Sequence, residues 1–319
     1  MIPQPVRILT ISLLLLAEPA MAASQGSNIV LKTAWAQKYR NRVSIEANVT
    51  ILKVSGKEVD ADIHGGSREN QIGLPMVAEI LNGAEPSQQP ARSGLAPGTN
   101  PQKNVYGAWR IWFEHPPSGG TQCQHFTGQA PDICLNQTLT GPDSNPKHSF
   151  EIHPIFEVDG VRVGRSSLVV GTNAQIKETD QAFRVYTGPN KKITIARTTS
   201  GITLNSLQIM DNYVRMRVRV RQTSTPTKRN DGSTDGGWIR ADVLVSDPDL
   251  ADRASNLRVF YFLDSMPGDR LKTAAVDDEF EIVAIPRLNL DAILSASQAN
   301  QVVQIPLPFE FVAVGMVGQ

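Results

Sequence analysis

The sequence has little of what marks several large classes of protein. It holds two cysteines in 319 residues and 6% aromatic residues, and its 31 basic residues are matched by 31 acidic ones. This balance excludes a global electrostatic pull toward nucleic acid or anionic lipid, so such binding would need a local patch. After the first residues, no run of ~18 apolar residues occurs, which predicts no transmembrane segment.

Common catalytic and nucleotide-binding motifs are also missing. The sequence has no G-x-G-x-x-G, P-loop or H-E-x-x-H segment, and Ser166 and Ser167 lack the G-x-S-x-G setting of a hydrolase. Basic segments carry few aromatic neighbours, so the sequence shows no strong nucleic-acid signature. Function must therefore be sought in clusters of polar residues.

The amino terminus resembles an export signal. Residues 1–22 carry the basic Arg7 in their first part, then an apolar run centred on 13–16, and end in Ala20-Met21-Ala22. A basic start, a short apolar stretch and an A-x-A exit predict a cleaved signal peptide of bacterial type. We expect a periplasmic or extracellular protein, for which envelope proteins are candidate partners.

Both cysteines lie in one Gly/Pro-rich loop. In an oxidising compartment, Cys123 and Cys134 are expected to form a disulfide that closes this loop. The alternative is a zinc site that adds His125 and a fourth ligand, although the spacing is not a standard one.

Short strands with period-two alternation dominate the chain, whereas helical periodicity is confined to 173–183 and 288–298. In the first half, strands are expected at 43–54, 59–64, 73–81, 105–115 and 150–158. Five strands with a long connection between the third and fourth predict an OB-like five-stranded barrel, with two loop insertions. Seven or eight further strands after residue 165 predict an antiparallel β-sandwich-like domain.

The sequence thus predicts an all-β chain of two domains, at residues 28–163 and 165–319. No fixed-period internal repeat is visible.

A polar face is expected on the first domain. In "HSFEIHPIFEVDG" (148–160), alternation sends Phe150, Ile152 and Phe156 to one side and Glu151 and His153 to the other. Asp60, Asp62 and His64 are two residues apart, which puts all three on one face of the strand at 59–64. Glu79 lies on the outer face of the third strand. If the second, third and fifth strands are adjacent, one surface holds Asp60, Asp62, His64, Glu79, Glu151 and His153.

Three interpretations of this surface stay open. It is an interlocked hydrogen-bond network that fixes the barrel, with Arg110 as a compensating charge. Alternatively, it binds a divalent cation through carboxylate oxygens and imidazole nitrogens. The candidate ligands for such a metal are Asp60, Asp62, His64, Glu151 and His153. In the third interpretation, the metal or a histidine activates water in a hydrolase acting on a phosphodiester or glycan.

The segments "VDADIHGG", "LPMVAEI" and "HSFEIHPIFEVDG" resemble a group of bacterial exported proteins with D-x-D-x-H and E-I/L-H-P segments. The resemblance covers residues 43–160 and implies an OB-like domain that carries the same six polar residues. Ala61 stands where the group usually has glycine, and Ile155 where it usually has valine. The group has no settled activity, so the resemblance supports the fold more than the function.

A stripe of arginines lies on one strand of the second domain. Arg215, Arg217, Arg219 and Arg221 share a strand face, which suggests a site for phosphate, sulfate or another anionic ligand. The alternative is a solvated face paired with acidic neighbours such as Asp242. Taken together, we expect an exported binding or scaffold protein, with a metal-dependent hydrolase as the alternative.

Overall fold

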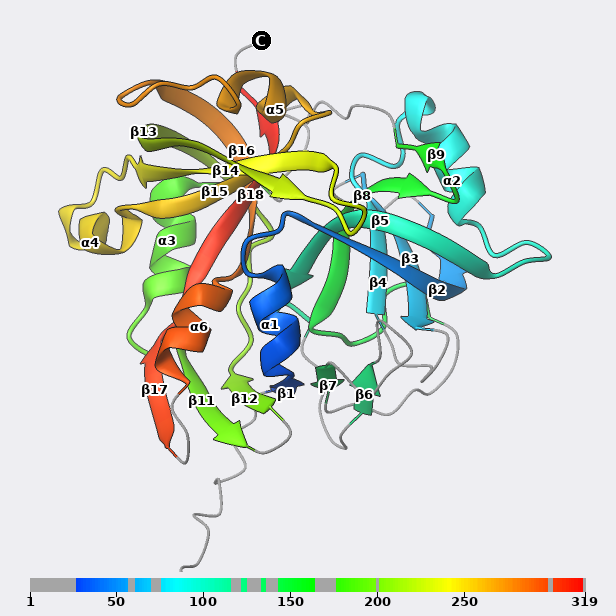
Figure 1. Ribbon diagram of the computed structural model, residues 1–319, viewed down its shortest axis with the longest axis horizontal. Coiled ribbons are helices and arrows are strands. Elements are labelled where there is room, and N and C mark those ends of the chain that lie inside the picture. The colour runs from blue at the N-terminus through cyan, green and yellow to red at the C-terminus, as the bar shows by residue number, and fades with distance from the viewer. Residues whose placement is uncertain are drawn as a thin grey trace, which may run out of the picture.

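The computed structural model describes most of the chain, and strands account for most of its regular structure. The described residues are 27–56, 61–69, 76–115, 122–124, 133–135, 143–163, 176–198, 201–297 and 301–317. The expected signal peptide at 1–22 lies outside them. Within these ranges the strands form three sheets (Figure 1), which confirms the all-β class.

The first sheet closes into a five-stranded barrel, at the right in Figure 1. Its strands are β2 (Ser44–Val54), β3 (Ile63–Glu69), β4 (Met76–Ile80), β5 (Gln102–Ile111) and β8 (Phe150–Val158), with the short β9 (Val161–Arg162) beside β8. They pair in the order β4-β3-β2-β5-β8, and a parallel β4–β8 ladder closes the ring. The predicted OB-like barrel is confirmed, and its second, third and fifth strands are adjacent as expected.

Alternation of side chains explains why β2 lines the barrel interior. Ile45, Ala47, Val49 and Ile51 are all buried, as the sequence predicted, while Asn48 between them is exposed. The connection between β4 and β5 carries the short helices η1 (Pro86–Gln88) and α2 (Gln89–Leu95). The second of these packs against β8 and β9 and covers this side of the barrel.

Two extra residues in β8 change the expected alternation. Tyr106 pairs with Glu157, Gly107 with Ile155 and Trp109 with Ile152, so β8 advances five residues where β5 advances three. Each such bulge reverses which face the following side chains reach. Ile155 therefore joins the main core, and Phe156 stacks on Phe262 at 3.8 Å instead of lying with Ile152. The prediction that Phe156 shares a face with Ile152 is wrong.

The second half of the chain builds a sandwich-like arrangement from two further sheets. One sheet contains β10 (Ile176–Glu178), β13 (Tyr213–Lys228), β14 (Thr234–Val243), β15 (Leu257–Phe262), β16 (Glu279–Leu288) and β18 (Phe309–Met316). Its order is β10-β13-β14-β15-β18-β16, and a β13–β16 ladder closes it on itself. Apart from β10, this is the pairing pattern of the barrel, with β15–β18 as the parallel ladder. The topology is therefore repeated, although the sequence shows no periodic repeat.

The third sheet, at the bottom of Figure 1, takes strands from both halves of the chain. Its order is β17 (Val302–Pro306), β11 (Lys192–Thr198), β12 (Gly201–Ser206), β1 (Ser27–Leu31), β7 (Ile133–Leu135) and β6 (Gln122–Gln124). Since β1 pairs with both β12 and β7, this sheet crosses the boundary predicted near residue 164. In β6–β7 the backbone register sets Cys123 opposite Cys134. Their side chains lie outside the described part, so the disulfide stays a prediction.

Short helices pack on these sheets. They are α1 (Thr33–Tyr39), α3 (Thr179–Thr187), η2 (Pro248–Leu250), α4 (Ala251–Ala254), α5 (Met266–Leu271) and α6 (Leu290–Ala296). The segment predicted to be helical at 288–298 contains α6. The one predicted at 173–183 overlaps α3 only from Thr179, since 176–178 form strand β10. Asn289 caps α6 by accepting a hydrogen bond from the Ala292 amide. In the described part of the chain, each helix is too short or too polar to cross a membrane.

Each closed sheet contains a buried arginine–glutamate pair at the same place in its topology. Arg110 of β5 pairs in register with Glu151 of β8, and Arg287 of β16 pairs in register with Glu310 of β18. The Arg110 Nη1 to Glu151 Oε2 distance is 2.6 Å, and the Arg287 Nε to Glu310 Oε1 distance is 2.8 Å. All four residues are at most 4% exposed.

The two closed sheets contact each other through these arginines. Arg110 donates to the carbonyl of Pro286, the residue before Arg287, at 3.0 Å. Arg287 in turn donates to the carbonyl of Trp109, the residue before Arg110, at 3.4 Å, and its guanidinium lies 3.8 Å from the centre of the Trp109 ring. This reciprocal contact fixes how β5 and β16 cross.

A test of the barrel closure uses Gly107 of β5. A Cβ atom there would lie 2.4 Å from the carbonyl oxygen of Pro154, so β8 would have to move. We expect Gly107→Ala to lower the free energy of unfolding by about 1–3 kcal/mol, the cost of overpacking. Urea unfolding measures it. Gly56→Ala, with nothing within 4 Å of its Cβ, is the matched control and should change stability little. Equal effects of both substitutions would contradict this packing.

Candidate functional site

Five of the six predicted polar residues come together where the barrel meets the second half of the chain. We call the set the polar cluster; it comprises Asp62, His64, Glu79, Glu151 and His153. Their exposed fractions run from 0% at Asp62 and His153 to 9% at His64. The sixth residue, Asp60, lies outside the described residues. Glu79 and His153 alternate with core residues such as Ala78 and Ile152, so they lie on the outer face that alternation predicted, and the second half of the chain buries this face.

The route by which Asp62 reaches the cluster differs from the prediction. The strand begins at Ile63, and Ala61 has a φ of 70°, so Asp62 precedes the strand and does not share a regular pleat with His64. A positive φ favours glycine, which gives a physical reason for glycine at this position in the resembling group. Backbone reversal at Ala61, and not strand alternation, directs Asp62 inward.

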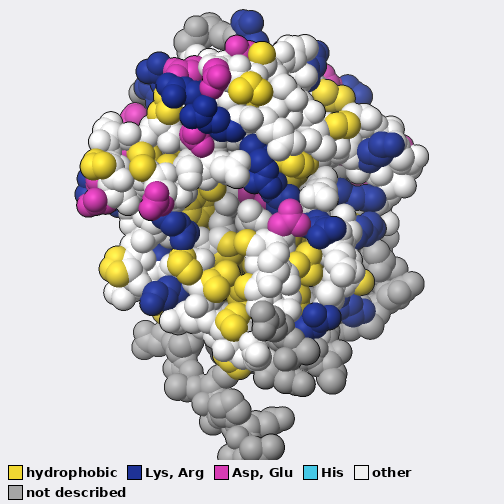
Figure 2. Space-filling view, turned by 60° about the vertical axis from the view of Figure 1, so that its left-hand side comes forward, with side chains coloured by type: hydrophobic (Ala, Val, Ile, Leu, Met, Phe, Trp, Pro, Cys, Tyr) yellow, Lys and Arg dark blue, Asp and Glu magenta, His cyan; other side chains and the backbone are white. Residues whose placement is uncertain are grey.

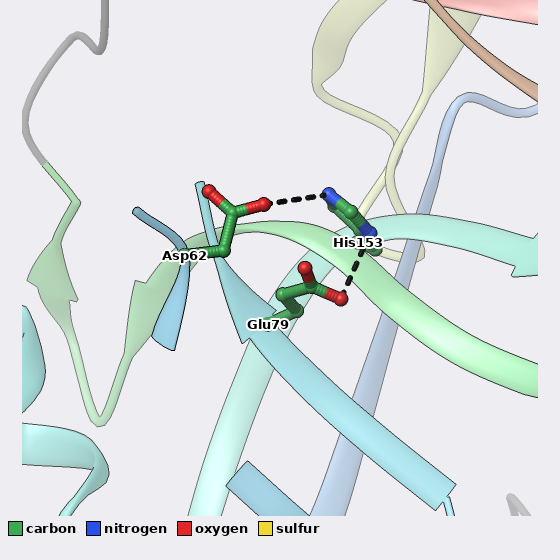
Figure 3. Close-up of side chains that lie close together, drawn as sticks. All are labelled: Asp62, Glu79 and His153. Atoms are coloured by element: carbon green, nitrogen blue, oxygen red, sulfur yellow. Dashed lines mark ion pairs between the residues drawn. The ribbon is translucent and has the colours of Figure 1, made fainter. Parts of the chain in front are cut away.

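His153 lies between the carboxylates of Asp62 and Glu79 (Figure 3). Its Nδ1 is 3.0 Å from Oε2 of Glu79 and 3.4 Å from Oε2 of Glu151. On the other side of the ring, Nε2 is 2.8 Å from the Tyr213 hydroxyl and 4.0 Å from Oδ2 of Asp62. One imidazole thus connects three acidic groups through its two different nitrogens.

Tyr213 brings the second half of the chain into the cluster. Its hydroxyl donates to Oδ2 of Asp62, and the Asn82 amide donates to Oδ1 of Asp62 at 2.7 Å. Since the only Tyr213 proton goes to Asp62, Nε2 of His153 has to donate to the tyrosine oxygen. Since Nδ1 faces the carboxylates of Glu79 and Glu151, this arrangement favours the imidazolium form of His153.

The remaining carboxylates are also paired. Glu151 accepts from Arg110 at 2.6 Å and lies 2.9 Å from Nε2 of His148. Glu79 lies 3.0 Å from Nε2 of His64, its cross-strand neighbour in the β3–β4 ladder. Because an unpaired charge in the interior is costly, these contacts allow the carboxylates to stay ionised there.

The pKa values follow from burial opposed by opposite charge. Burial alone raises the pKa of Glu79, but the charges of His153 and His64 outweigh it and hold that pKa well below its usual range. Arg110, with hydrogen bonds from neighbouring histidines, does the same for the pKa of Glu151. Burial lowers the pKa of His153, yet Glu79 and Glu151 raise it to about 10.

A metal ion would find a smaller ligand set than the sequence suggested. One ligand atom each from Asp62, Glu79 and His153 lies within 4.8 Å of the others, whereas His64 and Glu151 are not part of this group. Zinc bonds of ~2.1 Å need donors that converge on one point. His153 instead points Nδ1 at Glu79 and Nε2 toward Asp62, so its ring lies between the two carboxylates (Figure 3).

Two members of the site were missed by sequence reasoning. Tyr213 lies some 150 residues after Asp62, and its only local signal was its position beside the arginine stripe. His148, in the same short segment as Glu151, precedes the strand and escapes alternation. A contact made by the fold of a distant segment leaves no periodic signal.

Each arginine of the stripe has an acidic partner in the structure. Arg215 pairs with Glu281, both Arg217 and Arg219 pair with Glu279, and Arg221 pairs with Asp242 and Asp277. Basic and acidic side chains lie next to one another on the upper part of the face in Figure 2. This agrees with the solvated, paired face and leaves little free positive charge for an anion.

No protein-family model matches the chain, and no curated protein matches its sequence. Function therefore has to be inferred from geometry.

The Arg110 pair gives a first test. Arg110→Met removes the only guanidinium that contacts Glu151 in the described structure, which leaves a buried carboxylate short of charge. We expect the free energy of unfolding to fall by about 3–5 kcal/mol. Arg217→Met, which breaks a solvent-exposed pair, is the control and should have a much smaller effect. Similar losses in urea unfolding would argue against a buried ionic cluster.

The cluster also predicts a pH dependence in metal-free protein. His153 has its pKa raised from 6.5 to about 10, so its contribution is complete below pH 6.5 and is lost as the pH rises through about 10. Glu79 and Glu151, with lowered pKa values, contribute above pH 4.5 and lose this as the pH falls. We expect the stability difference between wild type and His153→Gln to shrink from neutral to alkaline pH. A constant difference would show that His153 is neutral.

Proposed function

We propose that the chain is an exported protein that works as a binding or scaffold module, with the polar cluster as an internal lock. The observation that carries this proposal is the closure of His153: it is 0% exposed, and both ring nitrogens face groups of the protein. A general acid or base has to reach a substrate. In the described structure, His153 and Asp62 are 0% exposed and Glu79 is 2% exposed, which leaves a substrate almost no access to them.

The lock acts between the barrel and the second half of the chain. Tyr213 joins Asp62 to His153, and Arg110 joins Glu151 to the carbonyl of Pro286. Breaking either connection leaves a buried polar group without its partner, which costs about 1–3 kcal/mol for a neutral group and more for a charged one. The two parts are thereby held in one orientation, which a scaffold or a shared binding surface requires.

Export and partners belong to the same proposal. The residues 1–22 support export, and an exported chain encounters envelope proteins as partners. The exposed outer strand β17 (Val302–Pro306) at the end of the third sheet offers an edge to which another strand could pair.

A metal-dependent hydrolase of phosphodiester or glycan substrates is the second candidate. It is favoured by the approach of Asp62, Glu79 and His153 to within 4.8 Å. A divalent cation held there would activate water for hydrolysis. For this, His153 would have to lose a proton and direct one nitrogen at the ion, and Tyr213 would have to release Asp62.

Metal analysis of the purified mature protein separates the two candidates. We expect no stoichiometric zinc, manganese or magnesium in wild type, Asp62→Asn or His153→Gln, and lower stability in both variants. Tyr213→Phe should destabilise by about 1–3 kcal/mol, because Asp62 loses a donor. Leu207→Ala, at a position 42% exposed, is a surface control.

The metal-dependent hydrolase predicts the opposite result. One equivalent of metal in wild type that is lost in both Asp62→Asn and His153→Gln would refute the lock. Metal-dependent cleavage of bis(p-nitrophenyl) phosphate, abolished by the same substitutions, would establish the hydrolase.

A further inference from the structure

A cavity of about 290 Å³ lies between the barrel and the second half of the chain, away from the polar cluster. Its walls come from β5, β8 and β9 on one side and from β14 and the hairpin before it on the other. In Figure 1 the β13–β14 hairpin, in yellow, reaches across toward β5 and β8. The volume is near the lower end of the ~300–1,000 Å³ common for small-molecule sites.

The register of the two closed sheets relates Ser44 of β2 to Tyr213 of β13. Ser44 lies opposite Ala108, two places before Arg110. In the other sheet Val214 lies opposite Ala284, three places before Arg287, so Tyr213, the residue before Val214, is at the equivalent position. The repeated topology therefore places a serine where the other half has a tyrosine.

These equivalent residues reach across to opposite aspartates. Tyr213 donates to Asp62 at the start of the second barrel strand, and Ser44 donates to Asp235 at the start of β14. On the first side the tyrosine ring fills the space around His153. On the second side Asp235 lines the cavity and also accepts a hydrogen bond from the Tyr106 hydroxyl.

Aromatic rings form the inner wall of the cavity. Phe156 stacks on Phe262 at 3.8 Å, and Tyr106 meets Phe262 edge to face at 6.0 Å. Phe156 is only half-buried, so part of an apolar ring is available. Rigid, flat rings of this kind bind the apolar face of a ring-shaped ligand at little entropic cost.

Charged groups of both signs surround these rings, and most are already compensated. Arg162 pairs with Asp264, and Arg229 lies 4.0 Å above the Tyr106 ring and 3.6 Å from Glu46. A ligand with a net charge would disturb this balance. A neutral ligand would not, and it could accept hydrogen bonds from the N–H groups of Arg162 and Arg229.

Acceptors are also present in the cavity wall. Asp235 accepts hydrogen bonds from the hydroxyls of Ser44, Tyr106 and Thr227, which shows that its carboxylate already binds hydroxyl groups. Glu157 lines the cavity and adds a second carboxylate. A neutral ligand with many hydroxyls, which both donate and accept, matches donors and acceptors so arranged.

We infer that this cavity, which we call the inter-barrel cleft, binds a neutral saccharide unit. The sugar ring packs on the half-buried Phe156, and its hydroxyls bond to Arg229 and the nearby carboxylates. The inference rests on the proposed function as a binding protein and names its ligand class.

The test is a titration of the full mature protein, followed by backbone-amide NMR. The probes are D-glucose, N-acetylglucosamine, maltose and cellobiose, with sodium sulfate as the anionic comparison. We expect saturable shifts at Tyr106, Arg229 and Asp235 with at least one sugar, and none with sulfate. Arg229→Ala should weaken this binding by about tenfold or more, the loss of one charged hydrogen bond. Arg240→Ala is the matched control, since Arg240 also lies over a ring, Trp238, but outside the cavity.

Three results overturn the inference: no saturable shift with any of the sugars, shifts with sulfate in place of sugars, or equal weakening by Arg229→Ala and Arg240→Ala. Failure of the proposed function is detected separately, in the proton NMR signals of the sugars. Release of glucose from maltose or cellobiose would refute a binding protein, while saturable shifts at the cleft would still support the inference.

Discussion

Both parts of the molecule depend on His153, which is fully buried where the barrel meets the second half of the chain. His153 can keep its proton in the interior only because Glu79 and Glu151 lie on one side and Tyr213, bonded to Asp62, on the other. Glu79 and Glu151 in turn have pKa values held low by the histidines and the arginine beside them. These residues come from separate strands, so the barrel and the second half must be correctly placed before any of the charges is paired. The polar cluster thus depends on the whole fold and also constrains it.

The two halves of the chain share one topology but differ in the residues around their shared contact. Each closed sheet buries an arginine–glutamate pair at the same register, and the two arginines donate to each other's strand. Around this shared contact the halves diverge. Tyr213 donates to Asp62 in the buried polar cluster, whereas its counterpart Ser44 donates to Asp235, which lines the inter-barrel cleft.

Strand alternation was a reliable guide where the ladder is regular and failed where it is interrupted. The buried face of β2, from Ile45 to Ile51, follows the prediction because its pairing with β5 is continuous. Phe156 departs from it because β8 carries two extra residues relative to β5. Asp62 reaches the cluster by a backbone turn at Ala61, which no periodic pattern encodes. The polar residues were correctly grouped because the strand order, inferred from the number and spacing of strands, brings β3, β4 and β8 together.

The sequence by itself determined the β class, the barrel order and most members of the cluster, because local alternation and loop length act over short stretches of chain. The tertiary structure decided that the cluster is sealed, that Tyr213 completes it and that the arginine stripe is paired. It also decided where the cleft lies. These features depend on contacts between residues tens of positions to more than a hundred positions apart. Burial, which sets the energy of a charge, is a property of the packed chain and not of any segment.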